Sequence, residues 1–212
     1  MDKKRYFDKN IYKVGFLDIE THGAGYNANQ CFLISYYLKV WDMKKCETKD
    51  YKKVIDKKTL KYWNKKMLNN KKLQLLRPYD TELLKALVIQ MKKCDMIIGH
   101  YSDYFDVPLV RTRCFMLRIP FIKYTDKIRF GDTWKRARFG MSFIRNSLDN
   151  LGITFGFAIR KTRFDIFIWR LAGDYGNKKA LKKVLDHNKK DVEITRKVWK
   201  LCESAFSIPA KY

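Results

Sequence analysis

The sequence lacks any long hydrophobic run, and no stretch approaches the roughly 18 apolar residues that a membrane-spanning helix needs. Its first ten residues, MDKKRYFDKN, contain no apolar stretch that could serve as a secretory signal. The five cysteines are widely spaced and form no Cys-x-x-Cys pair, so neither a disulfide framework nor a zinc site is expected. We therefore expect a soluble intracellular protein with reduced thiols and no membrane partner, either cytoplasmic or made by a virus in its host cell.

Acidic residues are also scarce compared with basic ones. Lys and Arg number 46 against 22 Asp and Glu, which gives a formal net charge of +24. Such an excess attracts polyanions and favours a nucleic acid or an anionic membrane as the partner. A lysine-rich surface that only keeps the protein in solution is the alternative. Charge alone thus indicates a class of partner and no reaction.

The chain contains no internal repeat and no linker rich in Pro, Gly or Ser, so we expect one domain over residues 1–212 with a core at about 12–205. Alternating or β-branched apolar residues predict strands at 11–19, 31–41, 46–55, 96–100 and 125–132. A turn is expected at 23–29, and the lysine-rich segment 57–72 is expected to be exposed and partly helical.

Helices are predicted at 80–93, at 107–118 and over much of the chain from 142 onward. Asp80 or Thr81 is expected to cap the first of these helices. The last helix is expected to span about 178–204, with a break near Asp186. Strands that first form hairpins and then alternate with helices predict an α/β domain with a mixed sheet.

The segment FLDIET (16–21) places Asp18 and Glu20 on one face of a strand, because side chains alternate there. Two acids that project together from an apolar strand are costly unless a cation compensates them, and hard divalent ions bind carboxylate oxygens. The alternative is that both acids face solvent.

Two later segments carry further candidates. GHYSDYFDVPLV (99–110) puts Asp106 at the junction of a strand and a helix, where Asp is also a common N-cap, and Asp103 competes with it. In DHNKKDVEIT (186–195), His187 and Asp191 are four residues apart on a helix and so share a face.

These three segments, in this order, resemble the motifs of the DEDD superfamily of 3′–5′ exonucleases. The resemblance covers about residues 12–205, includes the segment LDNLGI (148–153), and is closest to the proofreading domains of family B DNA polymerases and their predicted stand-alone relatives. It implies a ribonuclease H-like fold, with a mixed five-stranded sheet flanked by helices. It also assigns the third carboxylate to Asp106, which leaves Asp103 outside, and the fourth to Asp191.

The resemblance implies a metal-dependent hydrolase that removes nucleotides from 3′ ends with two divalent ions, Mg²⁺ or Mn²⁺. Asp18 would contact both ions, Glu20 and Asp191 the ion that carries the attacking water, and Asp106 the other. His187 stands four residues before Asp191, a spacing at which the superfamily has tyrosine, whereas its histidine stands five before. Histidine ordinarily titrates near pH 6.5, so His187 could orient or deprotonate that water.

Further residues are expected to contact nucleic acid. By analogy, backbone amides near His22 and Gly23 hold the terminal nucleotide, while Tyr104, Phe105 or Trp134 stack on bases. Basic residues that could follow the phosphates lie in TWKRARF (133–139), in IRKTRF (159–164) and on one helix face, namely Arg136, Arg138, Lys161, Arg163, Arg111, Arg113 and Arg118. For each single aromatic residue, packing in the core is the alternative.

DNA, single-stranded or frayed, is the favoured substrate, and a replication or repair polymerase is a possible partner. An exoribonuclease is the first alternative, because nothing in the sequence indicates recognition of the 2′-hydroxyl. A non-catalytic nucleic-acid-binding module is the second, and the presence of all four acids argues against it.

Overall fold

A five-stranded mixed sheet forms the centre of the molecule, with the strand order β3-β2-β1-β4-β5. The computed structural model describes residues 11–23, 31–160 and 165–205. The first three strands are antiparallel neighbours, and β4 and β5 continue the sheet parallel to β1. The strands are β1 (Lys13–His22), β2 (Phe32–Asp42), β3 (Glu47–Val54), β4 (Met96–Gly99) and β5 (Arg129–Asp132). The predicted α/β class with a mixed five-stranded sheet is confirmed.

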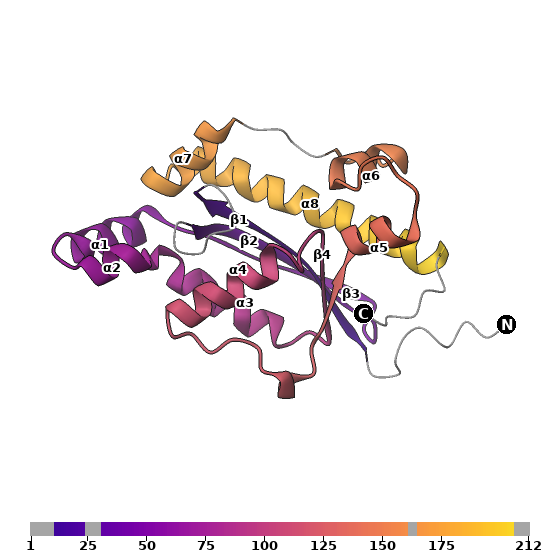
Figure 1. The fold of residues 1–212 in the computed structure, drawn as a ribbon, viewed down its shortest axis with the longest axis horizontal. Helices are drawn as coiled ribbons and strands as arrows, with labels where there is room; N and C mark the ends of the chain where they lie inside the picture. Colours follow the sequence, from indigo (N-terminus) through magenta and orange to yellow (C-terminus); the bar gives the residue numbers. More distant parts are fainter. Residues whose placement is uncertain (1–10, 24–30, 161–164, 206–212) are drawn as a thin grey trace.

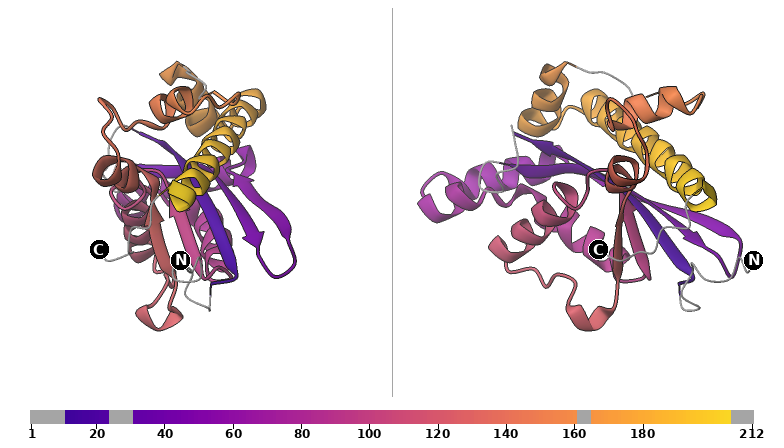
Figure 2. Two further views of the ribbon diagram at one scale, coloured as in Figure 1. Left: turned by 90° about the vertical axis from the view of Figure 1, so that its right-hand side faces the viewer. Right: turned by 45° about the vertical axis from the view of Figure 1, so that its right-hand side comes forward.

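Helices cover both faces of the sheet (Figure 1), with α8 on one face and α3 and α4 on the other. Two further views show the same layers, with the long helix α8 crossing the sheet (Figure 2). The helices are α1 (Lys57–Met67), α2 (Lys71–Leu76), α3 (Thr81–Met91), α4 (Asp106–Met116), α5 (Thr133–Gly140), α6 (Leu148–Thr154), α7 (Ile166–Tyr175) and α8 (Lys178–Ala205). Short 3₁₀ turns occur at Pro78–Asp80 and Tyr124–Asp126.

The strict alternation along β1 divides the core between the two faces. Leu17 and Ile19 point into the large cluster that α3, α4 and the N-terminal part of α8 complete. Phe16 points to the opposite side, where it packs with Tyr37 and with Trp199 from α8. Because Asp18 follows Phe16 by two residues, it faces α8 as well.

Most predicted elements are found close to their predicted bounds, and three differ. The predicted break near Asp186 is wrong, since α8 is continuous and Asp186 is exposed on its outer surface. The fifth strand is shorter than predicted, because Tyr124–Asp126 forms a 3₁₀ turn instead. The chain from 142 onward is interrupted by non-helical segments around 141–147 and 155–160. The predicted turn at 23–29 lies outside the described residues from 24 onward.

The cap predicted for α3 has a different role. Asp80 occupies the N-cap position but its side chain makes no capping hydrogen bond. Its carboxylate is fully buried and instead accepts hydrogen bonds from the Arg113 guanidinium, at 2.6 and 3.0 Å, and from the backbone N–H of Leu33 at 2.9 Å. This ion pair joins the start of α3, the middle of α4 and β2. The prediction that Arg113 contacts nucleic acid is therefore wrong.

Replacement of Asp80 by Ala should lower the free energy of unfolding by about 3–5 kcal/mol, because it leaves the buried Arg113 charge uncompensated. Urea denaturation monitored by circular dichroism measures this loss. The matched control is Glu82→Ala, which removes an exposed acid 2.8 Å from Lys85 and should cost less than about 1 kcal/mol. Equal losses in the two variants would contradict the anchoring role of the Asp80–Arg113 pair.

Candidate active site

A cleft of about 690 Å³ opens at the carboxyl end of β1, and all four acids singled out from the sequence line it. Asp18 and Glu20 come from β1, Asp106 from the first turn of α4, and Asp191 from the middle of α8. Strand alternation, a helix start and a helix face thus bring together side chains from widely separated parts of the chain. The other lining residues include the aromatic side chains Tyr101, Phe105 and Trp134.

Asp18 lies at the centre of this group. Burial raises the pKa of its carboxyl group well above the ordinary value, and the negative charges of Asp191, Glu20 and Asp106 raise it further. A hydrogen bond from the Asn188 side-chain amide, at 2.5 Å, opposes this shift. The amide oxygen of Asn188 in turn accepts a hydrogen bond from the Ser35 hydroxyl. A buried Ser35–Asn188 pair therefore orients Asp18 from behind.

Side chains from two helices contact Glu20. Its Oε2 accepts a hydrogen bond from the Trp169 indole of α7 at 2.9 Å, and its Oε1 lies 3.5 Å from His187 Nε2 on α8. The β1–β2 ladder shifts register between Glu20 and Thr21, which leaves one extra residue on β2 directly beside Ser35. Such bulges re-aim side chains, and they are frequent next to active sites.

The Asp106 carboxylate contacts β1 along the edge that faces β4. The β1–β4 pairing ends at Phe16 and Ile98, and beyond it the Asp106 carboxylate accepts a hydrogen bond from the Ile19 backbone N–H at 3.2 Å. Asp106 is the first residue of α4 and not its cap, because Phe105 occupies the cap position. Asp103, the competing candidate, forms an ion pair with Lys135 at 2.7 Å and does not line the cleft.

Asp132 holds the turn that leads into Asp106. Its buried carboxylate accepts hydrogen bonds from the backbone N–H groups of Tyr101 and Asp103, at 2.9 and 3.1 Å, and from that of Trp134 at 2.8 Å. Burial raises its pKa although these hydrogen bonds oppose the shift. Tyr101 has φ 62°, a left-handed conformation that costs energy for a non-glycine residue. The hydrogen bonds of Asp132 stabilise this strained turn.

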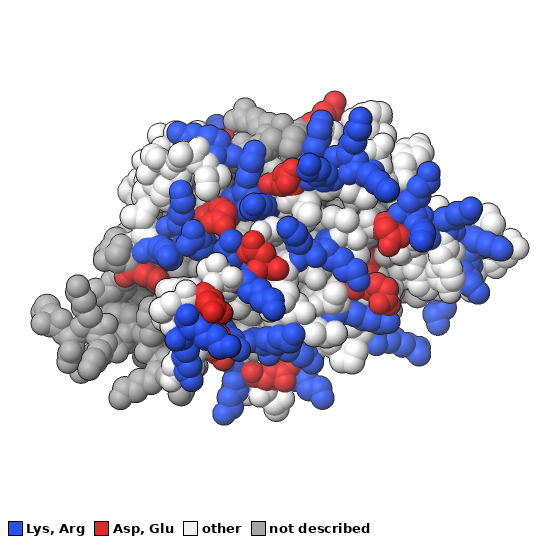
Figure 3. Space-filling view, turned by 180° about the vertical axis from the view of Figure 1, so that it is seen from behind, with Lys and Arg blue, Asp and Glu red and all other residues white. Residues whose placement is uncertain are grey.

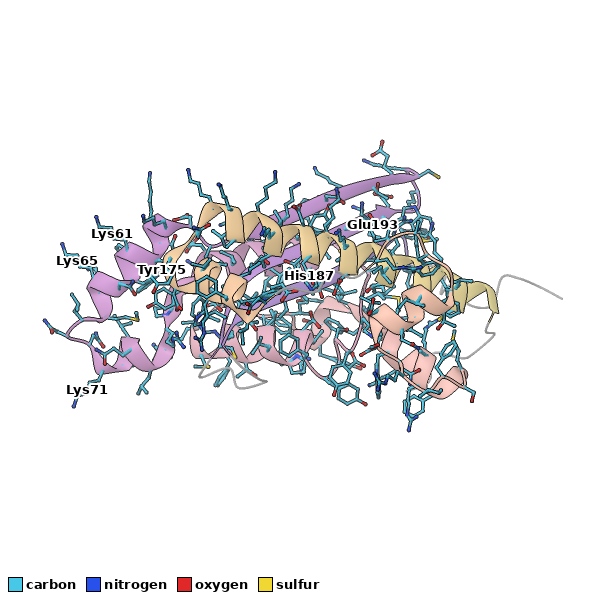
Figure 4. The ribbon with its side chains drawn as sticks, turned by 90° about the horizontal axis from the view of Figure 1, so that it is seen from above. Lys61, Lys65, Lys71, Tyr175, His187 and Glu193 are labelled. Carbon is cyan, nitrogen blue, oxygen red and sulfur yellow. The ribbon has the colours of Figure 1, made fainter. Side chains whose placement is uncertain are left out.

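The buried His187 imidazole lies close to Glu20 and Asp191. It is only 5% exposed, and the Trp169 ring packs edge-on against it with the ring centroids 5.6 Å apart. Its Nε2 is 3.5 Å from Glu20 Oε1 and 3.8 Å from Asp191 Oδ2. It does not line the cleft. Seen from above, His187 and Glu193 project from different sides of α8 (Figure 4).

Aromatic side chains form one wall of the cleft. Tyr101, Phe105 and Trp134 line it directly, and Tyr104 packs beside them and is 46% exposed. The ring centroids of Tyr101 and Tyr104 are 4.9 Å apart in a stacked arrangement, and Trp134 meets both rings edge-on. Among the predicted stacking residues, the structure therefore places Phe105 and Trp134 at the cleft and Tyr104 at its margin.

The predicted phosphate contacts are less well placed. The Arg136 guanidinium lies 3.6 Å from the centre of the Trp199 ring, and burial lowers its pKa. Arg138 is exposed on the same helix. Lys161 and Arg163 lie outside the described residues. Binding of nucleic acid by these residues stays a prediction.

His22 ends β1 and contacts α7. Its Nε2 lies 2.8 Å from Asp174, its ring stacks on Phe32, and a Cβ added at Gly173 would lie 2.2 Å from the imidazole. Burial lowers the pKa of His22, although Asp174 raises it. Gly23 follows with φ 104°, which favours glycine. The predicted contact of this segment with a terminal nucleotide is untested.

The donor set fits hard divalent cations. Four carboxylates face one cleft, and their mutual repulsion raises the pKa of Asp18, which is the electrostatic problem that Mg²⁺ or Mn²⁺ would relieve. Within the described parts of the chain, no three His, Cys, Asp or Glu side chains are already arranged around one point. Protein donors hold Asp18, Glu20 and Asp106 instead.

The sequence reasoning missed Ser35, Asn188, Trp169 and Asp132. Among these four residues, only Asn188 has a signal in the sequence, because it follows His187 within the third motif. Asn188 is buried, and a buried amide requires a hydrogen-bond partner. Ser35 and Trp169 lie 153 and 149 residues from the partners that they contact, and no local pattern marks such contacts.

Comparisons with known proteins identify a superfamily and a shared fold. The family model of the RNase_H superfamily matches residues 15–202, and the chain belongs to this superfamily. Among solved structures, the chain is similar to the family B DNA polymerase from the hyperthermophilic archaeon Pyrobaculum calidifontis, with a TM-score of 0.62 and 14% identity. That match covers 90% of this chain and 24% of the polymerase, so the likeness is to one part of a much longer protein. No curated protein matches the sequence. No described helix is long and apolar enough to cross a membrane.

Replacement of Asn188 by Ala should raise the Mn²⁺ concentration needed for half-maximal stabilisation against heat by about 10–100-fold, the usual effect of losing a residue that orients a metal ligand. Differential scanning fluorimetry with increasing Mn²⁺ measures it. The control Lys189→Ala changes an exposed neighbour on the same helix and should leave the Mn²⁺ dependence unaltered. An Asn188→Ala curve that overlies the wild-type curve would show that Asp18 needs no such support.

Proposed function

We propose that the protein is a metal-dependent 3′–5′ exonuclease of the DEDD superfamily that acts on single-stranded or frayed DNA. The observation that carries this proposal is the convergence of Asp18, Glu20, Asp106 and Asp191 on one cleft. Membership of the RNase_H superfamily and the fold shared with part of a DNA polymerase support a nuclease, and the order of the three motifs supports the finer assignment. Association with a replication or repair polymerase is proposed on the same grounds.

Asp18, Glu20, Asp106 and Asp191 would hold two divalent ions, which when bound neutralise phosphate charge and activate a water molecule. The surrounding protein keeps these ligands in place. Asn188 and Ser35 fix Asp18, Trp169 fixes Glu20, and the backbone of β1 fixes Asp106. Pre-organised ligands lower the cost of ordering the site at the moment of reaction.

His187 acts in this proposal mainly as a positioning residue. Its Nε2 faces Glu20 and Asp191, and the Trp169 ring covers the imidazole. The general-base role predicted from the sequence requires access to a water in the cleft, which a side chain that is 5% exposed has little of. Orientation of the two acids is the role that the contacts favour.

The aromatic wall supports a single-stranded substrate. A base that leaves a duplex loses stacking and pairing at a cost of a few kcal/mol. Stacking on an aromatic side chain such as Trp134 or Tyr101 returns about 1–3 kcal/mol per base, and an unpaired strand has no pairing to lose. Single strands and frayed ends are therefore the favoured substrates over blunt duplexes.

With 5′-labelled oligonucleotides and Mg²⁺ or Mn²⁺, we expect a ladder that shortens from the 3′ end, fastest on a single strand and slower on a blunt duplex. Activity should vanish in EDTA and in Asp18→Ala, because the carboxylates then lack their ions or their central ligand. The control Asp103→Ala alters a nearby acid outside the cleft and should retain cleavage.

Cleavage that persists in EDTA, or in Asp18→Ala, would exclude the metal-dependent reaction. Cleavage of a circular single strand would identify an endonuclease. RNA oligonucleotides of the same sequence belong in the same assay, since preference for RNA would establish the exoribonuclease alternative. Binding without any cleavage would establish the non-catalytic module.

The role of His187 is tested by its replacement with Ala. If His187 positions Glu20 and Asp191, the loss of rate should be largely recovered at high Mn²⁺ concentration, because weakened ligands can be saturated. If it is the general base, the rate should fall about 10²–10⁴-fold at every Mn²⁺ concentration. Initial rates measured over a wide Mn²⁺ range separate the two roles. A variant within a few-fold of wild type throughout would exclude both.

A further inference from the structure

Helices α1 and α2 form an extension that projects beyond the sheet at the end where β1 terminates (Figure 1). We call residues 57–77 the basic arm. It contains seven lysines and one arginine and no acidic residue. Over most of the face seen from behind, acidic side chains lie between the basic ones (Figure 3). The basic arm differs because it has no acids of its own.

The lysines of the basic arm point into solvent. Lys57, Lys58, Lys61, Lys65 and Lys71 are all exposed, and among described residues none of them lies within an ion pair. Figure 4 shows Lys61, Lys65 and Lys71 directed away from the body of the molecule. By contrast, Lys39 on β2 is paired with Asp50 and Glu193, at 2.9 Å from each. The positive charges of these five lysines are therefore accessible to an external anion.

Exposed aromatic rings accompany these charges. Tyr62 of α1 is 55% exposed and Tyr175 at the end of α7 is 67% exposed. The start of α1 adjoins the end of α7, since a Cβ at Gly176 would lie 3.0 Å from the Lys57 backbone. Lysines interleaved with exposed aromatic rings are the surface that single-stranded nucleic acids bind, through phosphates and stacked bases.

A short chain of contacts also connects the basic arm to the cleft. The Arg77 guanidinium lies 5.1 Å from the Phe32 ring centre, and Phe32 stacks on His22 with the centroids 4.9 Å apart. His22 directly follows Thr21 on β1, and Thr21 and Glu20 line the cleft. The basic arm therefore lies near the end of β1 that lines the cleft.

We propose that the basic arm is a second binding surface for the substrate, which holds the backbone of a single-stranded nucleic acid beyond the nucleotides in the cleft. This inference rests on the proposed function. The charges alone would attract any polyanion, and the exposed Tyr62 and Tyr175 favour a nucleic acid over an acidic peptide or a lipid surface, which offer no bases to stack.

The test measures binding of 5′-fluorescein oligodeoxynucleotides of about 6 and 24 nucleotides by anisotropy, over a range of salt concentrations. All variants are built on Asp18→Asn, called the parent, and are measured in EDTA. Under the proposed function the parent does not cleave the oligonucleotides. The arm variant adds Lys58→Gln, Lys61→Gln and Lys65→Gln. One control makes Lys→Arg changes at the same positions. The other, the β2–β3 control, removes equal charge at the opposite end of β1, with Lys44→Gln and Lys45→Gln in the β2–β3 turn and Lys49→Gln near the start of β3.

For the long oligonucleotide, the arm variant should lower the slope of log affinity against log salt by about 2, since each phosphate contact on a single strand contributes about 0.7. The ratio of its affinity for the long oligonucleotide to its affinity for the short one should also be smaller than in the parent. The Lys→Arg control and the β2–β3 control should keep the parental slope and length dependence.

Equal losses in the arm variant and the β2–β3 control would overturn the proposal, because they would reflect net charge alone. An arm variant with parental slope would overturn it as well, and the proposed function would stand if wild type still cleaves these oligonucleotides. A parent that binds neither length, together with a wild type that cleaves neither, would refute the proposed function itself. Stronger binding to vesicles of anionic phospholipid than to DNA would overturn the proposal and identify a membrane surface as the ligand of the basic arm.

Discussion

Electrostatic repulsion among four carboxylates is the constraint on which the local structure around β1 depends. Burial and the charges of three neighbouring acids raise the pKa of Asp18. A fold that places these groups together must either protonate one of them or supply a compensating cation. The acids lie on a central strand and two helices, so the packing of these elements brings their charges together.

The chain provides a separate support for three of the four acids, namely Asp18, Glu20 and Asp106. The Asn188 amide, the Trp169 indole and the Ile19 backbone N–H each hold one carboxylate. Hydrogen bonds to a carboxylate stabilise its charged form, which is the form that binds a divalent ion. The continuity of α8 matters here, because Asn188 and Asp191 must lie on the same side of one unbroken helix.

The sequence predicted the positions of most strands and helices, because these depend on local patterns such as the alternation along β1. The four acids came from the resemblance of three motifs, and the structure brings these acids to one cleft. The sequence could not predict the Ser35–Asn188 contact or the burial of Asp80 with Arg113, since those partners are separated by 153 and 33 residues. The predicted break of α8 at Asp186 is wrong because packing against the rest of the protein also decides where a helix continues. An exposed acid on a helix that is packed on its other side does not interrupt it.

The most direct measurement is the free energy of unfolding of wild type and Asp18→Asn by urea, at pH 5 to 8, in EDTA and in Mn²⁺. A carboxyl group whose pKa is raised in the folded state loses stability as pH rises from its unfolded pKa, near 3.9, through the folded one. In EDTA, Asp18→Asn should therefore be the more stable protein, by a margin that grows with pH until Asp18 is ionised. In Mn²⁺ the order should reverse, because the ion binds more tightly to the wild type, which has the complete ligand set, and so stabilises it more. Equal stability of the two proteins in EDTA, with no gain by wild type in Mn²⁺, would contradict a cation site at this cleft.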